Sequence, residues 1–377
     1  MKYYVIAGEP SGDLHGSNLI KELRELDHNA EFRCWGGDMM QKQGGMIIKH
    51  IRDLAFMGFI EVVMNLRTIL INIEFCKSDI ASYKPDAIIL IDYPGFNLRI
   101  AQYAKSIGIK VYYYISPQIW AWKEKRVEII KANVDRLFAI LPFEKAFYKK
   151  HNYNVDFVGH PLMDAIGNEG DISCSFDEFV EKNGLSGKPI IALLPGSRKQ
   201  EITAILPIMV SVKDDFPNYQ FVIAASSALP LSFFQPFVRS SATVKIVYKQ
   251  TYQLLQHASA ALVTSGTATL ETALFNVPEV VCYKGSFISY EIAKRLIKVE
   301  YISLVNLIMD REIVKELIQN KFTLKSLSKE LASLLHDNHR RTQLLNEYKK
   351  LRQVLGGPGA SKRTAEIIVS DLKKTRW

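Results

Sequence analysis

"VTSGTATLETALFNVPEVV", residues Val263 to Val281, contains two short apolar runs separated by a turn and a helical segment. The turn is Ser265-Gly266-Thr267, and Glu271 follows one helical turn later. A strand, a helix and a second strand in this order form a βαβ unit, which places both strands parallel in one sheet. The N–H groups at the helix start favour the binding of an anion. The Glu271 carboxylate is suited to accept hydrogen bonds from both hydroxyls of a ribose. A plain helix cap by Ser265 or Thr267 is the alternative.

The same alternation runs through most of the chain and predicts an α/β fold with two doubly wound, Rossmann-like domains facing a central cleft. Helical patterns include Leu14–Leu26 and Arg99–Ile107. The strand candidates of the first half are Tyr3–Ala7, Glu31–Trp35, Ala87–Ile91, Lys110–Ile115, Arg136–Ile140 and Asp156–Val158. Those of the second half are Pro189–Leu194, Gln220–Ala225, Val244–Tyr248, Ala260–Thr264 and Glu279–Tyr283.

The domain boundaries follow from a break in this alternation near Gly159, where the sequence becomes polar and rich in turn residues. A chain of 377 residues is long enough for about two domains. We expect an N-terminal domain over 1–165, a linker over 166–188 and a C-terminal domain over 189–355. Residues 356–377 are expected to form a helix that packs back on the N-terminal domain.

Composition limits the class of protein. A net charge of +9 favours anionic partners, such as phosphorylated substrates, lipid headgroups or nucleic acid, without choosing among them. The four cysteines are far apart and form no CxxC pair, which indicates reduced thiols and a cytoplasmic compartment. The N-terminal apolar run is too short for a signal peptide, and no run of about 18 apolar residues is present to span a membrane.

A second turn strengthens the interpretation of the first. "IIALLPGSRKQE" (Ile190–Glu201) is an apolar strand followed by Gly196 and Arg198 at the start of a helix. Gly196 frees the backbone for close approach, and the Arg198 guanidinium can clamp a phosphate. Because both turns end parallel strands of one sheet, together they predict a nucleotide-diphosphate pocket. Tyr252 and Asn306 are further candidates there, although packing or capping is the better explanation for either residue taken singly.

The first half carries two acidic candidates. "YYVIAGEPSGDLHGSNLI" (Tyr3–Ile20) has neither the GxGxxG nor the GK[ST] pattern, yet Glu9 follows its first strand and is suited to sugar hydroxyls. "DAIILIDYPGFNLRIA" (Asp86–Ala101) places Asp92 at the end of an apolar strand, where partial desolvation suits a general base. We expect Pro94 and Gly95 to form the turn there and Asn97 to begin the next helix. Turn or capping roles are the alternatives for both acids.

Two segments point to an amphiphilic partner. "YYYISPQIWAWKEKRVEIIK" (Tyr112–Lys131) sets two tryptophans beside Lys123 and Arg126, as suits a phosphate-bearing amphiphile or an interface. "LAFMGFIEVVMNLRTILINIEF" (Leu54–Phe75) is apolar over more than one helical stripe, so we expect part of it to lie in a membrane interface unless it is a core helix. The proposed lipid-facing residues are Phe59, Ile60, Val62, Val63, Leu66, Ile69 and Leu70.

Eight motifs in order from Ala7 to Leu307 closely resemble the lipid-A-disaccharide synthase family, inverting glycosyltransferases of the GT-B architecture. They are "AGEPSGDLHG", "MGFIEV", "IDYPGFN", "SPQIWAWKEKRV", "LPFEKAFY", "LLPGSR", "SGTATLE" and "YISLVNL". The resemblance implies transfer of 2,3-diacylglucosamine from its UDP donor to 2,3-diacylglucosamine 1-phosphate (lipid X), giving a β-1,6-linked disaccharide 1-phosphate and UDP. It also implies a peripheral protein on the cytoplasmic face of a Gram-negative inner membrane.

The resemblance also implies roles for individual residues. Asp92 takes the general-base position, and Glu9 lies in the N-terminal catalytic motif. The UDP-sugar residues are Arg198, Ser265, Gly266, Thr267, Glu271, Asn306, Lys284 and Tyr252. The acceptor residues are Gly8, Ser11, Gly12, Asp13, Asn97, Ser116, Gln118, Trp120, Trp122, Lys123 and Arg126.

The chain departs from the family pattern at Gly95, where an acidic residue is expected, and at Lys284, where an arginine is expected. No Asp-x-Asp triplet is present, so neither a metal nor another cofactor is expected. Nucleic acid is not an expected partner, and the oligomeric state is left open. A nucleotide-sugar epimerase of the same architecture is the alternative enzyme. A non-catalytic membrane or nucleic-acid adaptor is the other alternative, and UDP binding would argue against it.

Overall fold

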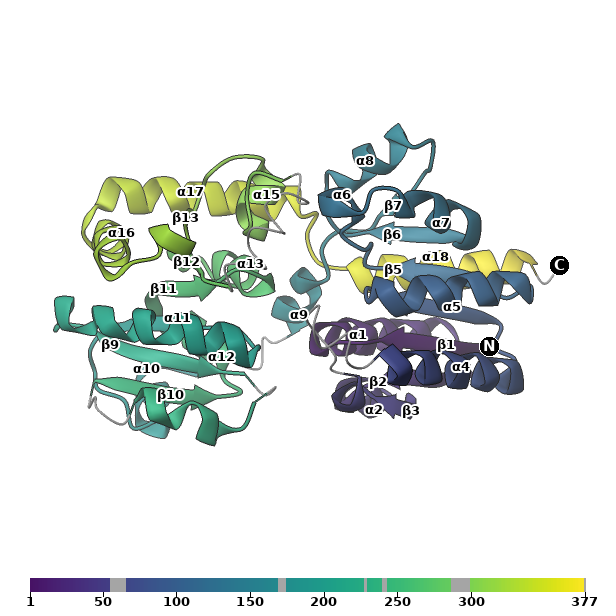
Figure 1. The fold of residues 1–377 in the computed structure, drawn as a ribbon, viewed down its shortest axis with the longest axis horizontal. Helices are drawn as coiled ribbons and strands as arrows, with labels where there is room; N and C mark the ends of the chain where they lie inside the picture. The colour runs from purple at the N-terminus through teal and green to yellow at the C-terminus, as the bar shows by residue number, and fades with distance from the viewer. Residues whose placement is uncertain (55–65, 169–173, 227–228, 239–242, 286–298, 376–377) are drawn as a thin grey trace. The chain divides into compact units, whose positions relative to one another are not determined.

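Two parallel-sheet units make up the protein, as the alternation of strands and helices predicts. The computed structural model describes residues 1–54, 66–168, 174–226, 229–238, 243–285 and 299–375. Unit 1 comprises Met1–Glu169 and Leu355–Trp377, and unit 2 comprises Gly170–Val354 (Figure 1). The predicted α/β class with two doubly wound sheets is confirmed.

The sheet of unit 1 has the strand order β3-β2-β1-β4-β5-β6-β7, and its neighbouring strands pair in parallel. Its central strands are almost wholly apolar and buried, as expected where helices cover both faces of a parallel sheet. The strands are β1 (Lys2–Ala7), β2 (Glu31–Gly36), β3 (Met46–His50), β4 (Ala87–Ile91), β5 (Lys110–Tyr114), β6 (Arg136–Ala139) and β7 (Asp156–Phe157).

Proline sets the start of two helices in unit 1. Pro10 begins α1 and Pro94 begins α5, because proline fixes a helical φ and lacks an N–H that the first turn would leave unpaired. The expectation that Pro94 and Gly95 form a turn before a helix starting at Asn97 is therefore wrong. The helices are α1 (Pro10–Leu26), α2 (Asp38–Lys42), α4 (Leu66–Tyr83), α5 (Pro94–Ser106), α6 (Ile119–Trp122), α7 (Arg126–Asn133), α8 (Glu144–Lys150), α9 (Leu162–Asn168) and α18 (Ala360–Thr375).

Unit 2 repeats the plan with the strand order β10-β9-β8-β11-β12-β13, again parallel. Its strands are β8 (Ile190–Leu194), β9 (Gln220–Ala225), β10 (Val244–Tyr248), β11 (Ala258–Thr264), β12 (Glu279–Tyr283) and β13 (Lys315–Ile318). Its helices are α10 (Phe176–Lys182), α11 (Lys199–Ser211), α12 (Thr251–His257), α13 (Thr267–Leu274), α15 (Leu304–Met309), α16 (Leu324–His336) and α17 (Asn338–Val354).

Three elements were not predicted from the sequence. β3 and β13 are edge strands with few fully buried side chains, so their sequences lack the apolar run that marks the central strands. α10 lies inside the segment that was expected to be a linker, and Ser175 begins it with a reciprocal capping box to Glu178. The capping pair was visible in the sequence but lies next to a polar, turn-rich stretch that masked it.

The last helix, α18, belongs to unit 1 and packs against α1 and α9 (Figure 1). The buried Asp164 carboxylate accepts hydrogen bonds from the backbone N–H groups of Gly359, Ala360 and Ser361 at the start of α18. At the other end, the Tyr112 hydroxyl donates to Asp371 at 2.7 Å. Strand β5, near the middle of the sheet, is thus tied to α18.

In the part of the chain that the structure describes, no helix is both long and apolar enough to cross a membrane.

Asp164→Ala is expected to destabilise unit 1 by about 3 kcal/mol, because it leaves three N–H groups at a buried helix start without their charged acceptor. The measurement is thermal unfolding of the full chain, followed by near-UV circular dichroism. The exposed Asp53→Ala in the same unit is the matched control and should unfold like the wild type. Equal midpoints for all three proteins would contradict this role of Asp164.

Candidate functional site

The strand order of each sheet reverses at one place, and four of the predicted site residues follow the strands there. In unit 1 the chain proceeds outward from β1 through β2 to β3, and then in the other direction from β4 to β7. In unit 2 the corresponding reversal separates β8 from β11. Connecting helices go to opposite faces on the two sides of such a reversal, which opens a crevice beyond the carboxyl ends of the strands. Glu9 follows β1 and Asp92 follows β4, while Arg198 follows β8 and Ser265 follows β11.

Asp92 has an unusual backbone conformation at the end of β4. Asp92 and Tyr93 have φ angles of 45° and 50°, and Ile115, after the neighbouring β5, has a φ of 66°. Such left-handed conformations are uncommon outside glycine and concentrate at functional sites. The Asp92 carbonyl accepts hydrogen bonds from the Tyr113 hydroxyl at 2.6 Å and from Asn97 Nδ2 at 2.7 Å. These two donors compensate for the strained conformation.

The carboxyl group of Asp92 is electrostatically perturbed. Its pKa is raised from 3.8 to about 7, mainly by burial and also by the negative charge of Glu9, while a backbone hydrogen bond from Tyr93 opposes the shift. Gly8 brings the two acids together, because a Cβ on Gly8 would lie 2.4 Å from the Tyr93 ring. A carboxyl with a pKa near neutrality is suited to accept a proton at physiological pH.

Asp13 has a structural role that the sequence did not reveal. Its buried carboxylate accepts hydrogen bonds from the N–H groups of Gly37, Met39 and Met40, and so caps α2. The expected direct contact of Asp13 with an acceptor is therefore corrected to a structural role. Ser11 is exposed in the first turn of α1, and Gly12 is buried against Ala7.

Buried polar groups fix the loop after β5. Ser116 Oγ lies 2.7 Å from the Tyr148 hydroxyl, and Trp120 Nε1 donates to Glu144 Oε1 at 3.3 Å. Glu144 also accepts from the N–H groups of Ile140 and Leu141, and burial raises its pKa to about 7. Ser116 and Trp120 therefore hold this loop in place through hydrogen bonds on its buried side.

The outer side of the same loop presents cations and an aromatic ring. Trp122 is exposed, and Lys123 Nζ lies 4.0 Å from its ring centroid. Gln118 is exposed, and Arg126 is half-buried. Desolvation lowers the pKa of both Lys123 and Arg126, and the Arg126 charge further lowers the pKa of Lys123, so the two cations lie near each other.

Gly95 is exposed in the first turn of α5. A Cβ built on it has no atom within 4 Å, so the backbone there would accommodate the acidic side chain that the family pattern has at this position.

The two predicted phosphate turns of unit 2 are neighbours. Gly196 has a φ of 93°, and a Cβ there would lie 2.8 Å from Thr264 Cγ2, so glycine lets the β8 turn approach the end of β11. Gly266 has a φ of 147° and directly precedes α13, whose first residue is Thr267. The first N–H groups of an eight-residue helix thus lie beside the Gly196 turn, as an anion site requires.

Charged side chains flank these turns. Arg198 is exposed, and its Nη1 donates to Glu201 Oε1 at 3.0 Å. On the other side, the Tyr252 hydroxyl donates to Glu271 Oε1 at 2.8 Å, and burial raises the pKa of Glu271. Tyr252 and Glu271, expected separately from the sequence, therefore act as a pair. Lys284 is half-buried just after β12, at the same edge of the sheet.

Asn306 is not available as a direct ligand. Its fully buried amide donates to the Val314 carbonyl and to Glu316 Oε1, and its Oδ1 accepts from the N–H groups of Ile313 and Val314. The expectation that its side chain meets a phosphate or sugar is therefore corrected, since these four hydrogen bonds occupy the amide. The Ser265 hydroxyl is also engaged, and donates to the Ile302 carbonyl at 2.8 Å.

The predicted membrane-facing residues divide into three groups. Phe59, Ile60, Val62 and Val63 lie outside the described residues. Ile69 packs against the core of unit 1, which corrects its expected lipid-facing position. The exposed apolar side chains of α4, here called the α4 patch, are Leu66 (49%), Leu70 (48%), Ile71 (59%) and Phe75 (45%). Ile71 and Phe75 were missed because the sequence did not fix which side of the helix faces the core.

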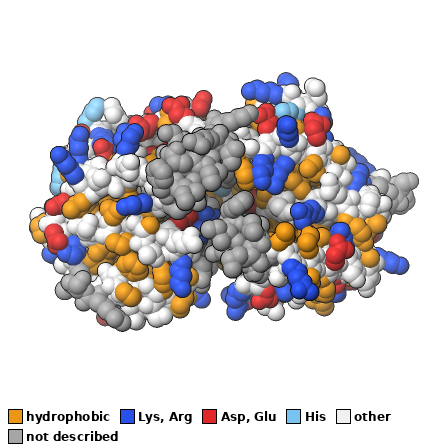
Figure 2. All heavy atoms as spheres, in the orientation of Figure 1, with side chains coloured by type: hydrophobic (Ala, Val, Ile, Leu, Met, Phe, Trp, Pro, Cys, Tyr) orange, Lys and Arg blue, Asp and Glu red, His pale blue; other side chains and the backbone are white. Residues whose placement is uncertain are grey.

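Hydrophobic and basic side chains lie side by side on the face of unit 1 that carries α4 (Figure 2). Arg67 is exposed within the α4 patch. An apolar surface interspersed with cations is the combination that binds anionic membrane interfaces.

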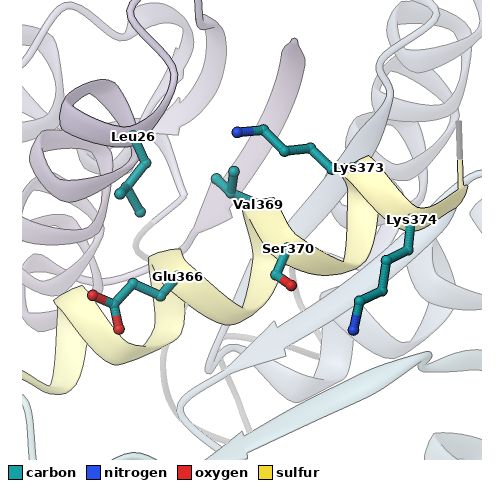
Figure 3. Close-up of a pocket in the computed structure, with 6 residues that line it drawn as sticks. All are labelled: Leu26, Glu366, Val369, Ser370, Lys373 and Lys374. Carbon is teal, nitrogen blue, oxygen red and sulfur yellow. The ribbon is translucent and has the colours of Figure 1, made fainter.

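An open groove of about 500 Å³ also lies on unit 1, between the last turns of α1 and α18. Val369 and Lys373 extend from α18 toward the side of α1 that carries Leu26 (Figure 3). Leu26 ends the helix that returns from the carboxyl end of β1, so this groove lies at the opposite edge of the sheet from Asp92. The predicted site residues do not line it. Within the described ranges, no group of three or more His, Cys, Asp or Glu side chains is placed to bind a metal.

Comparison with known proteins identifies close relatives over the full length. The sequence profile of the family described as Lipid-A-disaccharide synthetase matches residues 3–369. The Lipid-A-disaccharide synthase of Syntrophus aciditrophicus is 38% identical and covers 98% of both chains. That of Geobacter metallireducens is 37% identical and covers 99% of this chain and 97% of its own.

Solved structures with low sequence identity share the fold. A UDP-GlcNAc 2-epimerase from Neisseria meningitidis, bound to UDP-GlcNAc, aligns with a TM-score of 0.66 at 13% identity, over 99% of this chain and all of its own. The glycotransferase of kitacinnamycin also has a TM-score of 0.66, at 12% identity, over 98% and 99% of the two chains. The fold is thus the GT-B type, and at this identity the likeness concerns the fold alone.

The carboxyl of Asp92 is expected to titrate with a pKa near 7, and Glu9→Gln is expected to lower that pKa by removing a neighbouring negative charge. The carboxylate form is therefore lost as the pH falls below 7 in the wild type, and at a lower pH in the variant. Carbon-13 NMR of labelled aspartate measures both values, with Asp92→Asn identifying the signal. A wild-type pKa near 4, or no change in the variant, would contradict the coupling.

Proposed function

Because this chain belongs to the lipid-A-disaccharide synthase family and is therefore a glycosyltransferase of lipid A biosynthesis, we propose an inverting transfer of 2,3-diacylglucosamine. The donor is UDP-2,3-diacylglucosamine, and the acceptor is 2,3-diacylglucosamine 1-phosphate (lipid X). The products are a β-1,6-linked disaccharide 1-phosphate and UDP. The observation that carries this mechanism is Asp92, a carboxyl with a pKa of about 7 on a left-handed backbone at the reversal of the unit 1 sheet.

Asp92 is the proposed general base. Its carboxylate takes the proton of the acceptor 6-hydroxyl as that oxygen bonds to the anomeric carbon of the donor sugar. The bond between this carbon and the diphosphate oxygen breaks, and UDP leaves with the bonding electrons. A positioned base contributes about 10²–10⁴-fold in rate. Burial raises the pKa of this base and the negative charge of Glu9 adds to the shift, and the position of Glu9 beside Asp92 also suits a contact with sugar hydroxyls.

Unit 2 is the proposed donor site. The N–H groups at the start of α13 and the guanidinium of Arg198 stabilise the negative charge that develops on the leaving diphosphate. Glu271 is oriented by its hydrogen bond from Tyr252 and accepts hydrogen bonds from the ribose hydroxyls. Arg198 exchanges its Glu201 contact for the phosphate, at little cost because the Arg198 side chain is exposed.

Lys123 and Arg126 are the proposed partners of the acceptor phosphate. Their lowered pKa values reflect two nearby, partly desolvated cations, and such a pair gains when an anion neutralises it. The exposed Trp122 ring beside Lys123 offers an apolar surface for the acyl chains.

The α4 patch is the proposed contact with the cytoplasmic face of the inner membrane, where the acyl chains of both substrates lie. The patch provides apolar side chains, and Arg67 and the net charge of +9 favour anionic headgroups. We propose a peripheral attachment that needs no membrane-spanning segment.

Release of UDP in detergent micelles is expected only when donor and acceptor are both present, together with a tetra-acylated disaccharide. Asp92→Asn is expected to lower turnover by about 10²–10⁴-fold. It should leave the affinity for UDP unchanged, because Asp92 belongs to unit 1 and the proposed UDP residues belong to unit 2. Steady-state kinetics and calorimetry measure the two quantities.

The exposed Asp53→Asn is the matched control and should keep wild-type turnover. UDP release without acceptor would indicate hydrolysis or epimerase-like chemistry instead. Near-wild-type turnover in Asp92→Asn would remove this residue from the role of base.

Leu66→Gln combined with Leu70→Gln is expected to weaken binding to anionic vesicles at least tenfold, since burying one leucine contributes about 1.5–3 kcal/mol. Sedimentation with vesicles measures binding, and thermal unfolding should remain unchanged because both side chains are exposed. Leu26→Gln removes an exposed leucine of the same unit outside the α4 patch and serves as the control. Vesicle binding equal to that of the wild type would refute the role of the patch.

A further inference from the structure

A buried carboxylate, Glu316 on β13, is the centre of a hydrogen-bond network in unit 2. Its oxygens accept from the N–H of Ile302 at 3.0 Å and from the N–H of Ser303 at 2.9 Å. Glu316 Oε1 also accepts from Asn306 Nδ2 at 2.9 Å. One side chain thus fixes the segment that leads into α15, and each hydrogen bond is strengthened by the negative charge.

Ile302 connects this segment to the proposed diphosphate turn by hydrogen bonds in both directions. The N–H of Ile302 donates to Glu316, and the carbonyl of Ile302 accepts the hydroxyl of Ser265 at 2.8 Å. Ser265 is the first residue after β11, two positions before α13 begins. The position of the turn therefore depends on Ile302, and the position of Ile302 depends on Glu316.

The network is more than a helix cap. α15 already has its own cap, because the Ser303 hydroxyl accepts the N–H of Asn306 at 3.2 Å. Glu316 instead binds the N–H groups of Ile302 and Ser303, which precede the helix. Its carboxylate oxygens therefore hold the residues next to α15, of which Ile302 contacts the turn.

We propose that Glu316 is a positioning residue of the nucleotide site, which aligns the Ser265–Thr267 turn through Ile302 without contacting the nucleotide. This inference rests on the proposed function of the turn as the diphosphate site. It assigns Asn306 to the same supporting network, through its bonds to Glu316 and to the backbone before β13.

The test compares UDP binding by calorimetry in the full chain with wild-type sequence, Glu316→Gln, Ser265→Ala and the double variant. Glutamine keeps the shape but loses the charge and one acceptor oxygen, so the affinity for UDP is expected to fall about tenfold. Ser265→Ala is expected to weaken UDP binding as well. In the double variant the loss should not exceed that of the more affected single variant, because both changes break one connection.

Steady-state kinetics distinguish positioning from a purely structural role, because only a positioning role changes KM for the donor without changing KM for the acceptor. Glu316→Gln is expected to raise KM for the UDP-sugar donor about tenfold while KM for the lipid acceptor stays unchanged. Glu312→Gln is the matched control, since Glu312 is exposed, lies just before β13 and forms an ion pair with Lys315, the first residue of that strand. Glu316→Asp keeps the charge and should restore part of the affinity. It takes the place of the glutamine variant if that variant does not fold.

The outcomes separate this inference from the function on which it rests. Wild-type protein that binds no UDP would overturn the proposed donor site, and the inference with it. If the wild type binds UDP and the Glu316 variants bind it equally well at a lower melting temperature, Glu316 is only structural. Additive losses in the double variant would show that Glu316 does not act through Ser265.

Discussion

The reversal of strand order in each sheet is the constraint on which the rest of the structure depends. Because neighbouring strands at this point continue into connections on opposite faces, a crevice opens beyond their carboxyl ends. The chain then needs residues that tolerate tight turns and exposed backbone there, and Gly8, Gly196 and Gly266 provide them. The candidate functional groups occupy these turns because the core leaves the turns open.

The two reversals support different chemistry with the same topology. In unit 1 the turns carry carboxyl groups, and close packing of Gly8 against Tyr93 brings Glu9 near Asp92, whose pKa is raised by burial and by the nearby charge of Glu9. In unit 2 the turns carry small residues and a helix start, with Arg198 beside them. One reversal is suited to accept a proton and the other to accept an anion, which are the two requirements of sugar transfer from a nucleotide.

Much of this arrangement was predictable from the sequence, because central parallel strands are apolar runs and the residues that follow them lie at one edge of the sheet. Asp92, Ser265 and Glu271 were located in this way. The roles of Asp13 and Asn306 were not predictable, since their partners come from other segments, at Gly37 to Met40 and at Ile313 to Glu316. The edge strands β3 and β13 were missed because solvent on one side removes the need for an apolar run.

The path of the chain has a consequence for biosynthesis. Unit 1 consists of the first residues and the last helix, α18, with the whole of unit 2 between them. On the ribosome, unit 2 can therefore fold as one continuous segment, while unit 1 needs α18, which is synthesised after unit 2, before Asp164 and Tyr112 meet their partners. The part of the protein that is translated first is completed last, and a chain truncated before α18 would leave unit 1 unfinished although unit 2 is complete.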